Sequence, residues 1–298
     1  MSAEIQSVRS PKTATLIGFT AILMWAFLAL LSTAAGPIPP FQLTAMCFFL
    51  GGMTGVMSWT WRPHAIASLK QSWQVWATGT FGLCVYHILY FLAIQNAPPV
   101  EASLIAYLWP LLIVLFAALL PGEKLKVHHI IGAILGLAGA VAIITKGGTI
   151  GLSDGLKSGH LYALACAFIW SGYSVLSRRF GNVPTDVVAG FCLITAAVAG
   201  VLHVALETTV WPASSTQWLA IIVLGLLPLG VAFYTWDYGV KKGDIMVLGA
   251  ASYAAPLLST LVLLMFGFAT YHWSIAVACV LITAGAVVAA KDMLLRKM

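Results

Sequence analysis

Tyrosine, tryptophan and histidine lie deep inside several long apolar stretches of this chain, and they are the side chains best suited to bind a ligand. Tyr86 and Tyr90 are four residues apart, so a helix would present them on one face, with His87 beside them. In the next stretch, Tyr107 and Trp109 precede Pro110. Comparable aromatic residues elsewhere are Trp25, Trp170, Tyr234, Trp236 and Tyr253. Their rings offer stacking surfaces with one polar atom each, which suits a zwitterionic or apolar solute.

Tryptophan and tyrosine also gather where a membrane meets water, so a structural origin must be weighed. That origin fits six tryptophans at the ends of apolar stretches, namely Trp59, Trp61, Trp73, Trp211, Trp218 and Trp273. It fits Trp25, Trp170 and Tyr107 poorly, because these lie well inside their stretches. We expect the interior aromatic residues to line a substrate cavity, and ordinary packing between helices is the alternative.

Few ionisable side chains accompany these aromatic residues. His87 is the only histidine deep within an apolar stretch, so it is either a proton relay or a structural histidine. Asp237 lies four residues before Lys241 and is expected to form a local pair with it. Glu101 begins an apolar stretch, where an acid at a helix N-terminus is favourable.

Proline and glycine interrupt the apolar stretches at paired positions. Pro110 pairs with Pro256, and Gly82 pairs with Pro228, each across 146 residues. Proline removes one backbone hydrogen bond and kinks a helix, and such interruptions mark the binding site in many transporters. We expect helix kinks and a gating role at these four positions, with a packing kink as the alternative.

Enzyme chemistry finds little support in the remaining residues. The five cysteines lie in apolar runs without metal-ligand spacing, and eight of the nine acidic residues lie at the ends of stretches, in loops or in tails. The chain has no GxxxxGK[ST] motif for ATP, and no base at mid-membrane to meet a phosphorylated solute. We therefore expect no enzyme activity, no metal and no cofactor.

The elements that position these residues must be membrane-spanning helices. Of the 298 residues, 61% are hydrophobic and 8% are charged, whereas a soluble domain carries about 25% charged residues. A spanning helix needs about 20 mostly apolar residues. The sequence thus predicts an all-α polytopic membrane protein with ten transmembrane helices, at 13–33, 40–60, 73–97, 100–120, 127–146, 157–178, 185–206, 217–240, 245–267 and 272–290.

The basic residues predict the orientation of these helices, because lysine and arginine accumulate in cytoplasmic loops. With the N-terminus inside, thirteen of the fifteen bases are cytoplasmic, and only Lys146 and Lys157 lie outside. Both termini are then cytoplasmic. We therefore attribute the net charge of +6 to the orientation of the helices in the membrane. The expected partner is the lipid bilayer, and no nucleic acid is expected.

An internal repeat links the two halves of the chain, 1–149 and 150–298. A shift of 145–146 residues superposes Trp25 on Trp170 and Tyr107 on Tyr253. Chance similarity between apolar helices explains matched tryptophan, tyrosine and proline poorly. Because each half has five helices, an odd number, the halves are inverted, an architecture of secondary transporters that bind at the midplane. We expect alternating access within a monomer, and a passive channel is the alternative.

Nearly the whole chain resembles the drug/metabolite transporter superfamily, in its ten-span class with duplicated EamA-type domains. The resemblance rests on Trp25 and Trp170, on the runs Ala102-Ser-Leu-Ile-Ala-Tyr-Leu-Trp-Pro110 and Gly122-Glu-Lys-Leu125, and on the helix 131–139. Within the superfamily, Tyr86, His87, Tyr90 and 107–110 are similar to bacterial aromatic amino-acid exporters.

This resemblance implies a bacterial inner-membrane exporter of aromatic and other amino acids, whose interior aromatic residues and Pro110 line a central cavity. Export of other small drug-like or metabolite solutes is the alternative. One departure concerns Gly267-Phe-Ala-Thr270, where the family often repeats a Gly-Glu pair, so any role of Glu123 is not mirrored in the second half. The sequence leaves the transport direction and the coupling to protons open.

Overall fold

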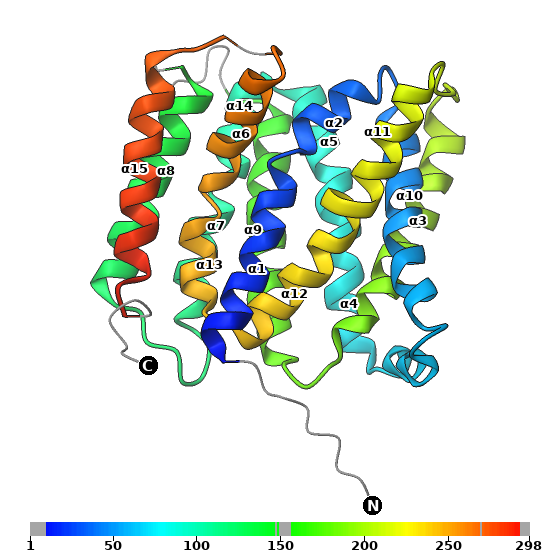
Figure 1. The fold of residues 1–298 in the computed structure, drawn as a ribbon, viewed down its shortest axis with the longest axis horizontal. Coiled ribbons are helices and arrows are strands. Elements are labelled where there is room, and N and C mark those ends of the chain that lie inside the picture. The colour runs from blue at the N-terminus through cyan, green and yellow to red at the C-terminus, as the bar shows by residue number, and fades with distance from the viewer. Residues whose placement is uncertain (1–9, 147, 149–155, 269, 293–298) are drawn as a thin grey trace, which may run out of the picture.

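The computed structural model describes residues 10–146, 148, 156–268 and 270–292, and every regular element in these ranges is helical (Figure 1). The first part of the chain forms α1 (Pro11–Trp25), α2 (Leu28–Ala34), α3 (Pro40–Ser58), the 3₁₀ helix η1 (Pro63–Leu69), α4 (Trp73–Thr80), the π-helical segment η2 (Phe81–Val85), α5 (Tyr86–Asn96), α6 (Pro99–Ala106), α7 (Trp109–Ala117) and α8 (Val127–Ile144).

The second part forms α9 (Ser158–Arg179), the 3₁₀ helix η3 (Thr185–Val187), α10 (Val188–Leu206), α11 (Ser215–Leu226), the π-helical segment η4 (Leu227–Val231), α12 (Ala232–Lys242), α13 (Ile245–Ala251), α14 (Ala254–Met265) and α15 (Trp273–Ala289). The all-helical prediction is therefore confirmed for the described residues.

Among the described residues, seven helical stretches are long and apolar enough to cross a membrane, and two further apolar helices, Val127–Ala142 and Trp273–Ala289, are shorter. The predicted span 100–120 is divided into α6 and α7, because the helix is interrupted at Tyr107 and Leu108. Large apolar side chains such as Leu119, Val204 and Met265 are about four-fifths exposed, as expected of a surface that faces lipid.

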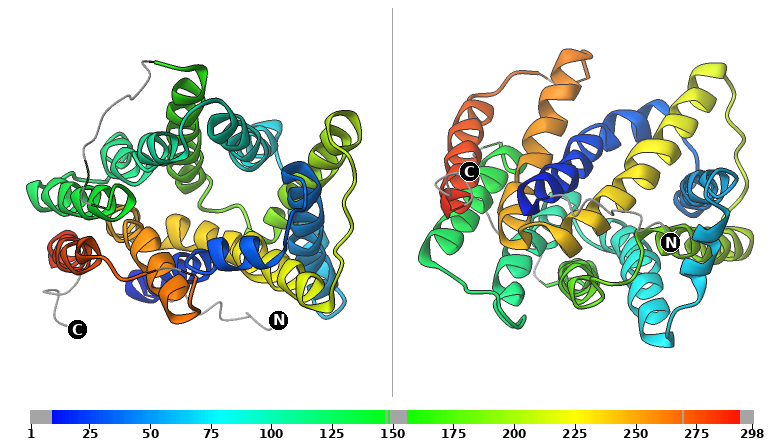
Figure 2. Two further views of the ribbon diagram at one scale, coloured as in Figure 1. Left: turned by 90° about the horizontal axis from the view of Figure 1, so that it is seen from above. Right: turned by 60° about the horizontal axis from the view of Figure 1, so that its bottom comes forward.

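Corresponding helices of the two parts run in opposite directions. In Figure 1, α1 rises from the lower end of the bundle, whereas α9 descends toward that end. Likewise α8 rises, and α15 descends beside it. Seen from above, the helices are arranged in a ring (Figure 2).

The helix interruptions recur at the positions that the paired glycine and proline residues indicated. Gly82 lies within the π-helical segment η2 and Pro228 within η4, and the two segments begin 146 residues apart. Pro110 follows the break between α6 and α7, and Pro256 follows the break between α13 and α14. A third break, between α1 and α2 after Trp25, has no equivalent in the continuous helix α9 and was not predicted.

Small residues allow α8 and α15 to pack closely, as the glycine-rich sequence 132–139 indicated. A Cβ atom on Gly132 would lie 2.6 Å from the carbonyl oxygen of Gly285, and one on Gly139 would lie 2.7 Å from Ile282. Glycine is thus required because the two backbones touch, in the way that small residues permit between membrane helices.

Gly132→Ala is expected to lower the melting temperature of the purified protein, because the added methyl group forces α8 and α15 apart at a cost of about 1–3 kcal/mol. Gly172→Ala is the matched control, since a Cβ there has no neighbour within 4 Å and alanine favours the helix. Thermal unfolding in detergent compares the two. Equal melting temperatures would contradict the packing argument.

Candidate functional site

Four tryptophan side chains meet at the centre of the bundle, and each contacts the other three. Trp25 ends α1, Trp109 begins α7, Trp170 lies mid-way along α9, and Trp236 lies in α12. The six distances between their ring centroids range from 5.2 to 6.4 Å. These are the separations at which aromatic rings attract one another. We call these four residues the tryptophan quartet.

Hydrogen bonds fix the orientation of two members of the quartet. The Trp25 indole donates to the carbonyl oxygen of Pro228 in η4, 3.1 Å away, and the Trp236 indole donates to the Ser174 hydroxyl at 3.1 Å. Trp236 is fully buried, and Trp170 and Trp109 are 4% and 6% exposed. Three of the four indoles are thus buried and Trp25 is partly exposed, and we call this packed layer the floor. The lining of a substrate cavity by these residues stays a prediction.

Three tyrosines lie next to this floor and remain half-buried. Tyr86 packs on Trp170 at 5.3 Å, and its ring is stacked with that of Tyr90. Tyr107, at the break between α6 and α7, is a near neighbour of both Tyr86 and Tyr90. Tyr90 also lies near Ser103 of α6. The structure thus brings together three phenols from α5 and the α6–α7 break, above the indole of Trp170.

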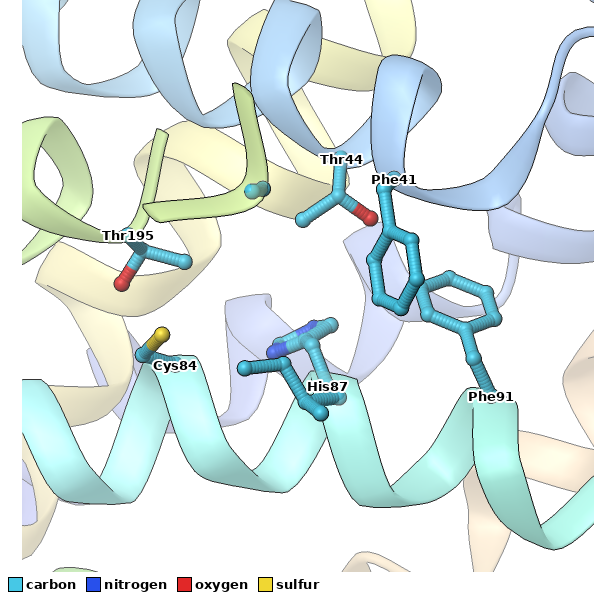
Figure 3. A pocket seen from close by; sticks show the side chains of 8 residues that line it. Phe41, Thr44, Cys84, His87, Phe91 and Thr195 are labelled. Atoms are coloured by element: carbon cyan, nitrogen blue, oxygen red, sulfur yellow. The ribbon is translucent and has the colours of Figure 1, made fainter. Parts of the chain in front are cut away.

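His87 is directed toward a different place. Its Nδ1 atom lies 2.7 Å from the carbonyl oxygen of Leu83, and its ring contacts Phe48 at 4.8 Å. It borders a narrow crevice between α3, α5 and α10, beside Phe41, Thr195 and others (Figure 3). The crevice is too narrow for a water molecule. This geometry is that of a histidine satisfied by its own helix.

Two other aromatic residues of the predicted set serve packing in this conformation. Tyr253 is fully buried in a separate cluster with α8 and α15, and its hydroxyl accepts a hydrogen bond from the backbone N–H of Leu111 at 3.2 Å. Tyr234 donates to the carbonyl oxygen of Gly51 at 3.0 Å. Neither forms an aromatic ring contact with a member of the quartet. Sequence reasoning missed Phe233, which packs on Trp25 and Trp170.

The acidic residues near the bundle ends are paired. Asp237 and Lys241 form the expected local pair at 2.8 Å, although both are more deeply buried than a helix end suggests. Glu101 lies 2.9 Å from His160 at the start of α9, so it does more than favour its helix N-terminus. Among the described residues, no three histidine, cysteine or acidic side chains are placed to hold a metal ion.

Helix contacts near the floor differ between the two ends of the bundle. At the end near α1's start, the last turns of α9 pack against α12, and Trp236 reaches Ser174 there. The internal repeat places α2 and α5 at the corresponding positions of the other end, where these two fully described helices make at most marginal contact. The bundle is therefore closed beneath the quartet and looser above it.

Known proteins share this sequence and fold. The EamA-like transporter family matches residues 12–145 and, a second time, residues 157–290. The chain is 53% identical to the protein named "Aromatic amino acid exporter YddG" of Ancylobacter novellus over 281 residues, which is 94% of this chain and 98% of that protein. The protein of the same name from Salmonella typhimurium is 27% identical over 260 residues, 83% of this chain and 86% of its own length.

A solved structure, titled "Crystal structure of protein", superposes with a TM-score of 0.88 at 51% sequence identity. The match covers 96% of this chain and 99% of the solved chain. Together with the helical runs long enough to cross a membrane, these similarities make the protein a multi-pass membrane transporter. The chain belongs to the EamA-like transporter family.

Proposed function

We propose that the protein exports amino acids, aromatic ones foremost, across the bacterial inner membrane by alternating access. The observation that carries this proposal is the 53% identity, over 94% of the chain, to a protein named an aromatic amino acid exporter. The three phenols above the tryptophan quartet support it, because they offer ring faces and hydroxyl groups to an aromatic zwitterion.

The proposed architecture has ten spans in two inverted five-helix halves, 1–149 and 150–298, with both termini cytoplasmic. Three observations support it: the family matches begin at residues 12 and 157, 145 residues apart; equivalent helices run in opposite directions; and the interruptions at Gly82 and Pro228 recur at one shift. One chain would contain both orientations, so a monomer would suffice for transport.

We place the substrate above the quartet, in contact with Tyr86, Tyr90 and Tyr107. The half-buried rings of these tyrosines retain accessible surface although they lie among central helices. Trp25, Trp109, Trp170 and Trp236 then serve as the floor, and the interruptions at Gly82, Pro110, Pro228 and Pro256 serve as the hinges. Tyr234 and Tyr253 would meet substrate only in another conformation.

Export of other small metabolites is the second candidate, because the chain is also 26% identical over 183 residues to the protein named "Biotin transporter" of Escherichia coli. Flux of labelled phenylalanine through purified protein in liposomes separates the candidates. Uptake that is accelerated by unlabelled amino acid on the opposite side would indicate a transporter, whereas unaffected flux would indicate a passive channel. The absence of amino-acid flux, with and without a pH gradient, would contradict the proposed cargo.

Tyr107→Ala is expected to reduce phenylalanine flux about tenfold or more, because the substrate loses an aromatic ring on which it can stack beside Tyr90. The yield of folded protein is expected to stay unchanged. Flux is measured in liposomes at equal protein density. His87→Ala is the comparison, since that ring lies in the crevice near Phe48. Equal losses in both variants would move the substrate away from the three tyrosines.

Trp170→Ala is expected to destabilise the protein by about 3–5 kcal/mol, because it leaves a cavity among the other three indoles and Tyr86. Trp61→Ala serves as the control, because Trp61 is 78% exposed. Thermal unfolding in detergent compares both variants with the parent. A Trp170→Ala protein as stable as Trp61→Ala would show that the quartet is not a packed floor.

A further inference from the structure

Arg178, in the last turn of α9, binds the end of α12 directly. Its Nη1 atom donates to the carbonyl oxygen of Gly243 at 2.7 Å and to that of Val240 at 3.1 Å. The last carbonyl groups of a helix lack intrahelical donors and carry partial negative charge, so they attract a cation. One guanidinium thereby joins α9 to α12 at the closed end of the bundle.

The other edge of the same guanidinium binds Glu123, in the loop between α7 and α8. The Nε atom of Arg178 donates to Oε1 of Glu123 at 2.8 Å, and Nη2 donates to the same oxygen. Arg178 and Glu123 are 24% and 23% exposed, so water screens their pairing only in part. Three segments that are distant in sequence are therefore held together by one side chain.

The internal repeat shows that this arrangement exists at one end only. The residues equivalent to Arg178 and Glu123 are Thr33 and Ala269, neither of which carries a charge. Thr33 lies in the last turn of α2, and residue 269 lies outside the described residues. Glu123 and its partner Arg178 therefore both lack a charged equivalent in the other half of the chain.

Asp237 and Lys241 form a second, buried pair at the same end of the bundle. Asp237 accepts a hydrogen bond from Thr185, just before α10. The equivalent residue at the other end is Phe91, which packs on Phe41 at the start of α3 with ring centroids 6.0 Å apart. Polar contacts thus attach α12 to the segment before α10 at the closed end, whereas a ring contact takes their place at the other end. Among the closed-end contacts, those of Arg178 join α9 and the α7–α8 loop to the end of α12.

We propose that Arg178 is the gating residue of the cytoplasmic side, holding α12 against α9 and Glu123 until substrate enters from the cytoplasm. The inference rests on the alternating access proposed above. Opening toward the cytoplasm requires Arg178 to release the carbonyl groups of α12, which water can then solvate. Within the described part of the chain, no charged pair joins α2 to α5, so the resting protein favours the conformation open to the outside.

The test uses Ser174→Cys as a reporter, because Ser174 is fully buried one turn above Arg178, between α9 and Trp236. Inside-out vesicles containing the full-length protein are treated with a membrane-impermeant maleimide. Adding Arg178→Met is expected to raise the rate of labelling at Ser174→Cys about tenfold, because two or more charge-assisted hydrogen bonds are lost. For each variant, the labelling of the same variant with Ser174 retained is subtracted. This removes the contribution of the natural cysteines.

Glu123→Gln is the second variant, and a smaller rise is expected because the bonds from Arg178 to Gly243 and Val240 remain. Arg62→Met is the matched control: Arg62 pairs with Asp186 at 2.8 Å on the same side but does not bind α12, so labelling should match the parent. Unchanged labelling in Arg178→Met and Glu123→Gln, or an equal rise in Arg62→Met, would overturn the proposal. Should Arg178→Met fail to fold, Glu123→Gln decides alone.

Labelling needs no substrate, so it separates this inference from the proposed cargo. Increased labelling in a protein that moves no amino acid would retain the gating residue and contradict only the substrate. Normal amino-acid flux with unchanged labelling would do the reverse.

Discussion

The contact among four indoles at the centre of the bundle is the interaction on which the remaining structure depends. Trp25 and Trp109 come from the first part of the chain, and Trp170 and Trp236 come from the second, so the quartet joins the two parts at the centre of the bundle. A membrane offers little hydrophobic drive between helices, and close packing must supply the association. Large flat rings with centroids 5.2 to 6.4 Å apart provide that packing.

Helix interruptions surround this centre, and in the proposed function they are its hinges. The π-helical segments at Gly82 and Pro228 and the breaks before Pro110 and Pro256 all lie close to the aromatic centre in sequence. Irregular backbone is tolerated inside a membrane only where protein or water satisfies its polar groups. The indole of Trp25 does so for the carbonyl oxygen of Pro228. The tryptophan quartet is therefore connected to the interruption at Pro228 through a hydrogen bond.

Sequence predicted the helical class, the paired interruptions and most residues of the aromatic centre, because apolar length, proline chemistry and aromatic type are local properties. It did not predict which aromatic residues touch. Tyr253 matches Tyr107 in the repeat, yet one is fully buried in packing and the other is half-buried near Tyr90. Such differences arise because a single conformation breaks the symmetry of the repeat. Arg178 appeared in the sequence only as a cytoplasmic base, since its partners lie in α12 and beyond α7.

In the proposed site, the substrate ring lies between the three tyrosines and the tryptophan quartet. The most direct measurement is a crystal structure of the protein with bound 4-iodophenylalanine, in which anomalous scattering locates the iodine atom. We expect one iodine peak in contact with Tyr107 and the indole of Trp170. A peak found only in the crevice beside His87, or only at the lipid-facing surface, would contradict it.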